Sequence, residues 1–89
     1  MFFPFLVLPD GTKVVYSDIQ KKDGKEYVLV KFKRWNDERN DFDRMECLLP
    51  NGKMTKIVGF TADEAANQEG HMHSLQDMIL ECSREDSKD

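Results

Sequence analysis

The chain has 89 residues, of which 39% are hydrophobic and 34% charged, and its formal net charge is −4. This length holds one domain with a modest core, and this composition excludes a largely disordered chain. Two cysteines, Cys47 and Cys82, are too few for a disulfide framework. We therefore expect reduced core thiols in a small cytoplasmic protein of bacterial type.

Residues 1–8 form an apolar segment that begins the chain. The segment lacks the basic start and cleavage site of a signal peptide, and it is too short to cross a bilayer. We expect a strand over residues 3–8, with one face carrying Phe3, Phe5 and Val7 and the other carrying Leu6 and Leu8. Pro4 has no amide hydrogen, which predicts that this strand lies at a sheet edge.

Alternating patterns predict further strands over residues 12–19, 26–35, 42–49 and 54–58. They are separated by turn sequences that suit positive φ angles, at Asp10-Gly11, Asp23-Gly24 and Asn51-Gly52. The residues expected in the core are Val28, Val30, Phe32, Met45, Cys47 and Leu49. The opposite face of the third strand is expected to carry Tyr27, Leu29, Lys31, Lys33 and Trp35.

The segment from residue 60 to residue 85 is predicted to be a helix. Thr61 and Glu64 have the spacing of a capping box, in which each side chain accepts from the other residue's backbone amide. Apolar residues at spacings of three, four and seven predict the face that packs on the sheet, namely Ala65, Met72, Leu75, Met78, Ile79 and Cys82. Gly70 leaves open whether the helix is continuous, kinked or split, and we favour one continuous or kinked helix.

These elements predict an α+β fold, an antiparallel β-meander of four to five strands with one C-terminal helix packed on one face. A single domain is expected over residues 1–85, followed by a disordered acidic tail over residues 86–89. The chain contains no internal repeat and no linker sequence.

No catalytic residues, cofactor or metal site are predicted. His71 and His73 are two residues apart, so on a helix they point in different directions and cannot chelate one ion together. Neither cysteine has a local partner that suggests a nucleophile. A small-ligand or metal site near Trp35, His71 and His73 is the third and weakest functional hypothesis, and surface histidines are its ordinary alternative.

The second hypothesis is a nucleic-acid-binding face formed by Tyr27, Lys31, Lys33, Arg34 and Trp35. Basic side chains alternating with aromatic rings on an open sheet are typical of proteins that bind single strands. The acidic net charge argues against nucleic acid as a partner, as does the absence of a spaced aromatic pair of RNA-recognition type.

The first hypothesis is a non-enzymatic interaction or accessory protein that self-associates, as a dimer, through its N-terminal strand. The interface residues would be Phe2, Phe3, Phe5, Leu6 and Leu8. One helix is expected to be too small to cover an edge strand that is apolar on both faces, and exposing several such side chains is unfavourable. A protein partner could shelter the same strand.

Overall fold

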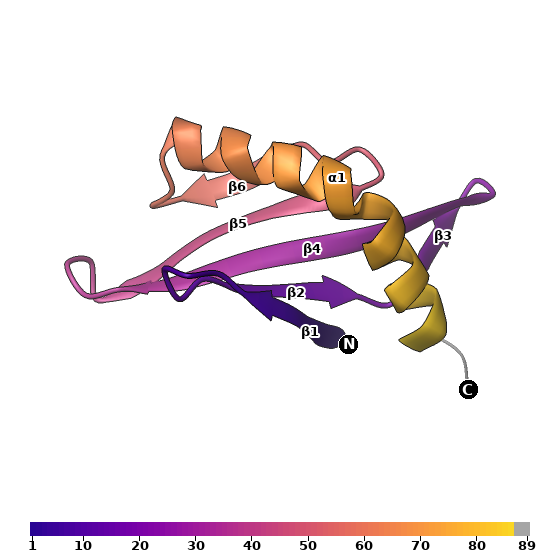
Figure 1. Cartoon of the computed structure of the whole chain (residues 1–89), viewed down its shortest axis with the longest axis horizontal. Coiled ribbons are helices and arrows are strands. Elements are labelled where there is room, and N and C mark those ends of the chain that lie inside the picture. The colour runs from indigo at the N-terminus through magenta and orange to yellow at the C-terminus, as the bar shows by residue number, and fades with distance from the viewer. Residues whose placement is uncertain (87–89) are drawn as a thin grey trace.

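A computed structural model describes residues 1–86 of the chain as one sheet covered on one face by one helix (Figure 1). The strands and helix are β1 (Phe2–Val7), β2 (Lys13–Ser17), β3 (Gln20–Lys22), β4 (Lys25–Asn36), β5 (Asp41–Leu49), β6 (Met54–Val58) and α1 (Ala62–Asp86). All strand pairs are antiparallel, in the order β1-β2-β4-β5-β6, and β3 pairs with β4. The predicted α+β class and meander are confirmed, with one strand more than expected.

The additional strand is β3, which pairs only with the first three residues of β4. The chain leaves β2 after Ser17 and re-enters the sheet at Gln20, just beyond the end of the second predicted strand at residue 19. The turn at Asp23-Gly24 has positive φ at both residues, as its sequence predicts. β4 therefore has β2 and β3 as successive partners on one edge and β5 on the other.

The helix α1 is continuous through Gly70, in agreement with the favoured prediction. The capping box is formed: the Thr61 amide donates to Glu64 at 2.9 Å, and the Glu64 amide donates to the Thr61 hydroxyl at 3.1 Å. The helix extends through Asp86, one residue into the predicted tail, while residues 87–89 lie outside the described residues. No helix in the described part of the chain is long and apolar enough to cross a membrane.

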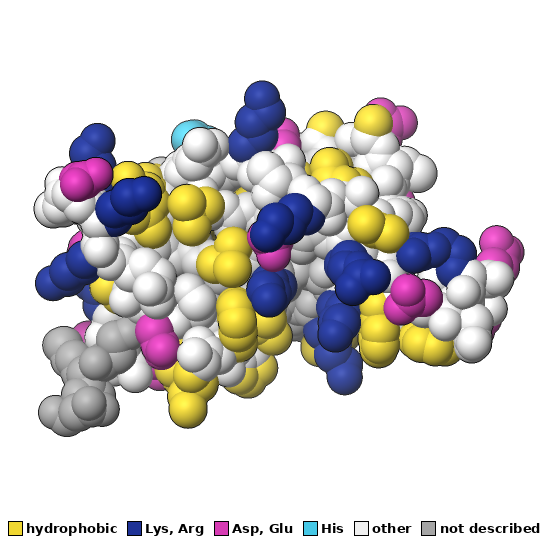
Figure 2. All heavy atoms as spheres, turned by 180° about the vertical axis from the view of Figure 1, so that it is seen from behind, with side chains coloured by type: hydrophobic (Ala, Val, Ile, Leu, Met, Phe, Trp, Pro, Cys, Tyr) yellow, Lys and Arg dark blue, Asp and Glu magenta, His cyan; other side chains and the backbone are white. Residues whose placement is uncertain are grey.

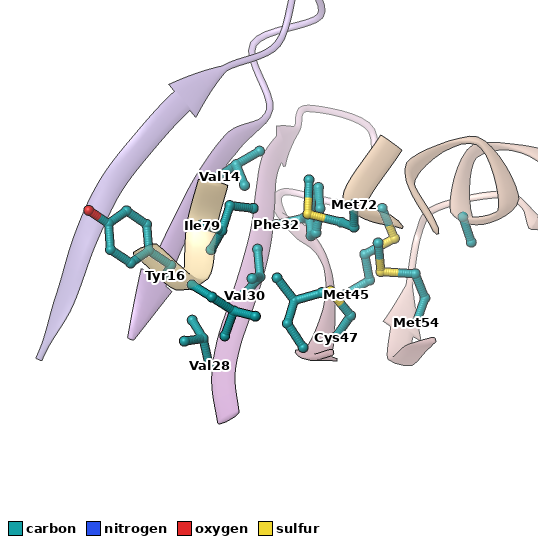
Figure 3. Packing of buried hydrophobic residues seen from close by; sticks show 13 residues of the cluster. Val14, Tyr16, Val28, Val30, Phe32, Met45, Cys47, Met54, Met72 and Ile79 are labelled. Carbon is teal, nitrogen blue, oxygen red and sulfur yellow. The ribbon is translucent and has the colours of Figure 1, made fainter. Parts of the chain in front are cut away.

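The core lies between α1 and the facing side of the sheet (Figure 3). All six residues predicted for the core of the third and fourth predicted strands are buried. On the helix, Met72 and Ile79 are buried as predicted, but Met78 is 53% exposed. Leu80 and Ser83 are buried in addition, and the Ser83 hydroxyl donates to the Ser17 carbonyl at 2.7 Å. In the last turns of the helix, the residues that pack on the sheet are therefore Ile79, Leu80 and Ser83, and Met78 lies outside this packed face.

The predicted division of the N-terminal strand into two apolar faces is wrong. The register of β1 against β2 shifts between Pro4 and Leu6, so that Phe5 is an additional, bulged residue. The shift places Leu6 opposite Val14, on the core side where Phe3 already faces Tyr16. Four apolar residues of this segment pack against the core, namely Phe3, Phe5, Leu6 and Leu8.

The edge position predicted for this strand is correct, because β1 is the first strand in the sheet order. The bulge changes which side chains remain outside. Met1, Phe2 and Val7 are the large apolar residues of this segment that stay exposed, at 83%, 41% and 64%. Most of the predicted interface is thus half-buried within its own chain.

Candidate functional site

The face of the sheet opposite α1 carries a groove of about 690 Å³. Figure 2 shows the molecule from behind, where basic side chains lie among apolar ones. All strands except β3 contribute to the groove. The groove residues that the following argument uses are Phe2, Lys13, Lys31, Lys33, Trp35, Phe42, Arg44, Glu46 and Lys56.

Three cations stand in a row across the centre of this face. Lys13 of β2 is directly opposite Lys33 of β4, and Lys33 is directly opposite Arg44 of β5. Neighbouring strands are only about 4.8 Å apart, and like charges placed opposite each other destabilise a sheet. In the described residues the one ion pair of this row joins Arg44 to Asp41, at 3.7 Å. Two of its three cations, Lys13 and Lys33, therefore have no carboxylate partner among the described residues.

The next row contains the groove's single carboxylate. Lys31 is opposite Glu46, but Glu46 pairs with Lys56 at 3.1 Å. Lys31 instead extends toward β1, where its ammonium lies 4.6 Å from the centre of the Phe2 ring. The Lys31 ammonium therefore contacts an aromatic ring rather than a carboxylate.

Aromatic rings lie at both ends of the groove. Trp35 and Phe42 are opposite each other on β4 and β5, and their rings meet edge to face with centres 5.1 Å apart. The Trp35 indole nitrogen donates to Asp37 at 2.7 Å, and the side chain is 50% exposed. The Lys33 ammonium lies 4.6 Å from the centre of the Phe42 ring. With Phe2 at the other end, the groove has an aromatic surface on each side of its cations.

The charge of the groove is opposite to that of the whole chain. It contains five cationic side chains and one carboxylate, a balance of +4, whereas the chain as a whole carries −4. The remaining residues must therefore carry −8 between them. The groove is therefore positive on a chain that is otherwise acidic.

Arg34 does not belong to this face, which corrects the predicted nucleic-acid-binding group. Its register partner is the buried Asp43, on the helix side of the sheet. The guanidinium donates to Asp43 at 2.7 Å, to Glu64 at 2.7 Å and to Asp10 at 3.0 Å. Arg34 therefore links three segments of the fold and is not available for a ligand.

Tyr27 also lies apart from the groove. It lines a separate shallow hollow, together with Leu80 and Arg84 of the helix. Lys31, Lys33 and Trp35 are the three members of the predicted group that the structure brings together.

The predicted association of Trp35 with His71 and His73 does not occur. Both histidines are exposed on α1, which covers the other face of the sheet from Trp35. Among the described residues, no group of three potential metal ligands is found. The third hypothesis therefore has no common site in this fold.

The cysteines lie in or beside the core. Cys47 is fully buried, and burial raises the pKa of its thiol to about 12, with Glu69 and Glu46 adding to the effect. A thiol held protonated in this way is a poor nucleophile. Cys82 is partly buried and packs against the core from the helix.

The predicted nucleic-acid-binding group lacks six of the nine groove residues named above, namely Phe2, Lys13, Phe42, Arg44, Glu46 and Lys56. Phe2 was predicted for the self-association interface instead. Lys13 and Arg44 are recognised only once the strand register is known, because each lies on a different strand from Lys33. Alternation along each strand was an available signal, since it places Phe42 and Arg44 on the side away from Met45.

In comparisons with protein-family models, curated proteins and solved structures, nothing matches this chain.

Proposed function

We propose that the protein binds single-stranded nucleic acid in the groove on the open face of its sheet. The single observation that carries the proposal is the row of like charges Lys13, Lys33 and Arg44, in which only Arg44 has an ion pair among the described residues, flanked by exposed aromatic rings. The cations supply phosphate contacts, and Trp35 offers a surface on which a base can stack. Such contacts are sequence-tolerant, so we expect little base specificity.

The like-charge row is the part of the sheet that local stability alone does not favour. Like charges placed opposite each other are unfavourable in a sheet, and such an unfavourable arrangement is expected at a site where a bound ligand neutralises the charges. A polyanion that lies across the row removes the repulsion among its three cations. The acidic remainder of the chain does not prevent this, because charges more than about 8 Å away are largely screened at physiological salt.

Two other polyanionic partners are less well matched to this face. A membrane surface favours protruding apolar side chains beside basic ones, whereas these cations line a hollow. An acidic protein segment would satisfy the cations but would not require aromatic rings at both ends. A single strand uses both features, because it alternates phosphates with stacking surfaces.

The test is a titration of the protein with labelled oligodeoxythymidylate, followed by anisotropy of the label and by Trp35 fluorescence. We expect quenching of Trp35 and a dissociation constant that rises with salt. Each neutralised phosphate contributes about −0.7 to the slope of log K against log salt. A groove charge of +4 therefore predicts a slope of about −2.8 at most.

The matched variants reverse the same number of charges at two places. Lys31→Glu with Lys33→Glu alters the groove, and Lys21→Glu with Lys22→Glu alters exposed positions on β3. We expect the first pair to abolish binding and the second to weaken it only slightly. Equal losses in both pairs, or binding to anionic vesicles but not to oligonucleotides, would refute the proposal.

Self-association through β1 is a second candidate function. It is favoured by Met1, Phe2 and Val7, which remain exposed along an edge strand. Pro4 and the bulge at Phe5 oppose it, since both features interrupt the regular hydrogen bonding that strand addition needs. Light scattering at high protein concentration separates the outcomes: a dimer supports this function, and a strict monomer opposes it.

A further inference from the structure

We infer that the groove is a two-platform site, in which a ligand must reach from the Trp35–Phe42 pair to Phe2 for full affinity. The inference rests on the proposed function and adds a minimum ligand length to it. Short oligonucleotides would occupy one aromatic surface, and longer ones would bridge both across the row of cations.

The spacing of the two aromatic surfaces sets this length. The Trp35–Phe42 pair occupies one register position of β4, while the Phe2 ring lies against Lys31, four residues back along the same strand. Four residues of strand extend about 13 Å, and Phe2 lies on β1, two strand spacings or about 10 Å across the sheet from β4, so the two surfaces are about 16 Å apart. Stacked nucleotides advance about 3.4 Å each, so bridging requires about five of them.

The cations lie between the two surfaces, where phosphates of a bridging strand would pass. Lys33, with its register partners Lys13 and Arg44, is two residues from Lys31 and two from Trp35. A strand stacked at both ends must therefore cross the positive row. Binding at both ends and neutralisation of the row are parts of the same event.

Two lysines occupy the ring faces that the bases would need. The ammonium of Lys31 lies over Phe2 and that of Lys33 over Phe42, each 4.6 Å from the ring centre. A cation held over a ring at an exposed site contributes little to stability. A nearby phosphate is a stronger partner for an ammonium, so each lysine can leave its ring as a base arrives.

The experiment measures affinity for oligodeoxythymidylates of about two to about ten nucleotides, with the wild-type chain and three variants. Phe2→Ala removes the second platform, and Phe2→Leu keeps an apolar side chain while removing the aromatic face. Val7→Ala is the matched control, because Val7 is an exposed apolar residue of the same strand that does not line the groove. Circular dichroism and thermal unfolding check that each variant is folded.

We expect a step in wild-type affinity at about five nucleotides, beyond the gradual rise that phosphate number produces. Both Phe2 variants should lower affinity for long oligonucleotides by about 5- to 140-fold and remove the step, since stacking contributes about 1–3 kcal/mol per base. They should leave binding of the shortest oligonucleotides unchanged, and Val7→Ala should behave as wild type.

Two contrary results are distinguishable. Salt-dependent binding without a step, or Phe2 variants that bind every length like wild type, would overturn the two-platform inference and leave the proposed function standing. Absence of binding at any length, at low salt, would overturn the proposed function itself.

Discussion

Asp43 is a fully buried carboxylate that accepts four side-chain hydrogen bonds. Its oxygens accept from Arg34 at 2.7 Å and 3.0 Å, from Arg39 at 2.6 Å and from Asn36 at 3.1 Å. Burial disfavours its charged form, but these donors outweigh that effect and hold its pKa below the ordinary value. Asp43 thus joins the β4–β5 hairpin to the Arg34 cluster and, through it, to the start of the helix.

We predict that Asp43→Asn lowers the free energy of unfolding by about 3 kcal/mol, because it removes the buried negative charge that accepts from both Arg34 and Arg39. Urea denaturation measures the change. Asp41→Asn is the control, since Asp41 is half-exposed and its ion pairs are long, at 3.7 Å and 4.0 Å. The control should cost less than about 1 kcal/mol, and equal losses in the two variants would contradict the argument.

Glu64 has its pKa lowered by the hydrogen bond from Arg34 and then by the amide of Thr61. A carboxyl whose pKa is lower in the folded state stabilises the fold above its unfolded pKa, and that contribution is lost as the pH falls through the folded value. We therefore predict that stability is maintained at neutral pH and decreases below about pH 4. In Glu64→Gln this decrease should be shallower, as measured by urea denaturation across the acid range. A steeper decrease in the variant would be inconsistent with this assignment.

At the scale of elements, two glycines have opposite roles. A Cβ at Gly59, between β6 and α1, would lie 1.9 Å from Asp43 Oδ1, and its φ of 84° is unfavourable for other residues. Gly70 lies within α1 with nothing within 4 Å of a Cβ.

We predict that Gly59→Ala destabilises the protein by at least about 2 kcal/mol, through strain and overpacking. Gly70→Ala should stabilise it by about 0.5–1 kcal/mol, because alanine is the better helix former. Thermal unfolding of the pair measures both effects. A stabilising Gly59→Ala would show that the loop can move away from Asp43.

The elements themselves were largely predictable from local pattern. Alternation identified Val28, Val30 and Phe32 as core, and the spacing of Thr61 and Glu64 identified the start of the helix. The bulge at Phe5 was not predictable, because it arises from the competition of several apolar side chains for one core face. The candidate site was missed in part for a related reason: the row of cations exists only in the register between strands.

At the scale of the molecule, the fold is two layers with unlike surfaces. The helix covers one face of the sheet, and the other face remains open and basic (Figures 1 and 2). Arg34 shows why residue type alone misled the sequence prediction, since it neighbours Lys33 and Trp35 in the chain but lies on the opposite face of the sheet. Because neighbouring residues of a strand point to opposite faces, Arg34 forms a structural ion pair while the adjacent Lys33 is a candidate ligand contact.

The long strand β4 is bordered on both edges, by β2 and β3 on one side and by β5 on the other. Its backbone can be opened to solvent only by separating the sheet through its middle, whereas β1 and β6 can detach from the ends. We therefore predict that amide protons of Val30 and Phe32 exchange with deuterium only through global unfolding, and those of β1 and β6 through smaller openings. Amide exchange followed by NMR would locate the last part of this protein to come apart at its centre.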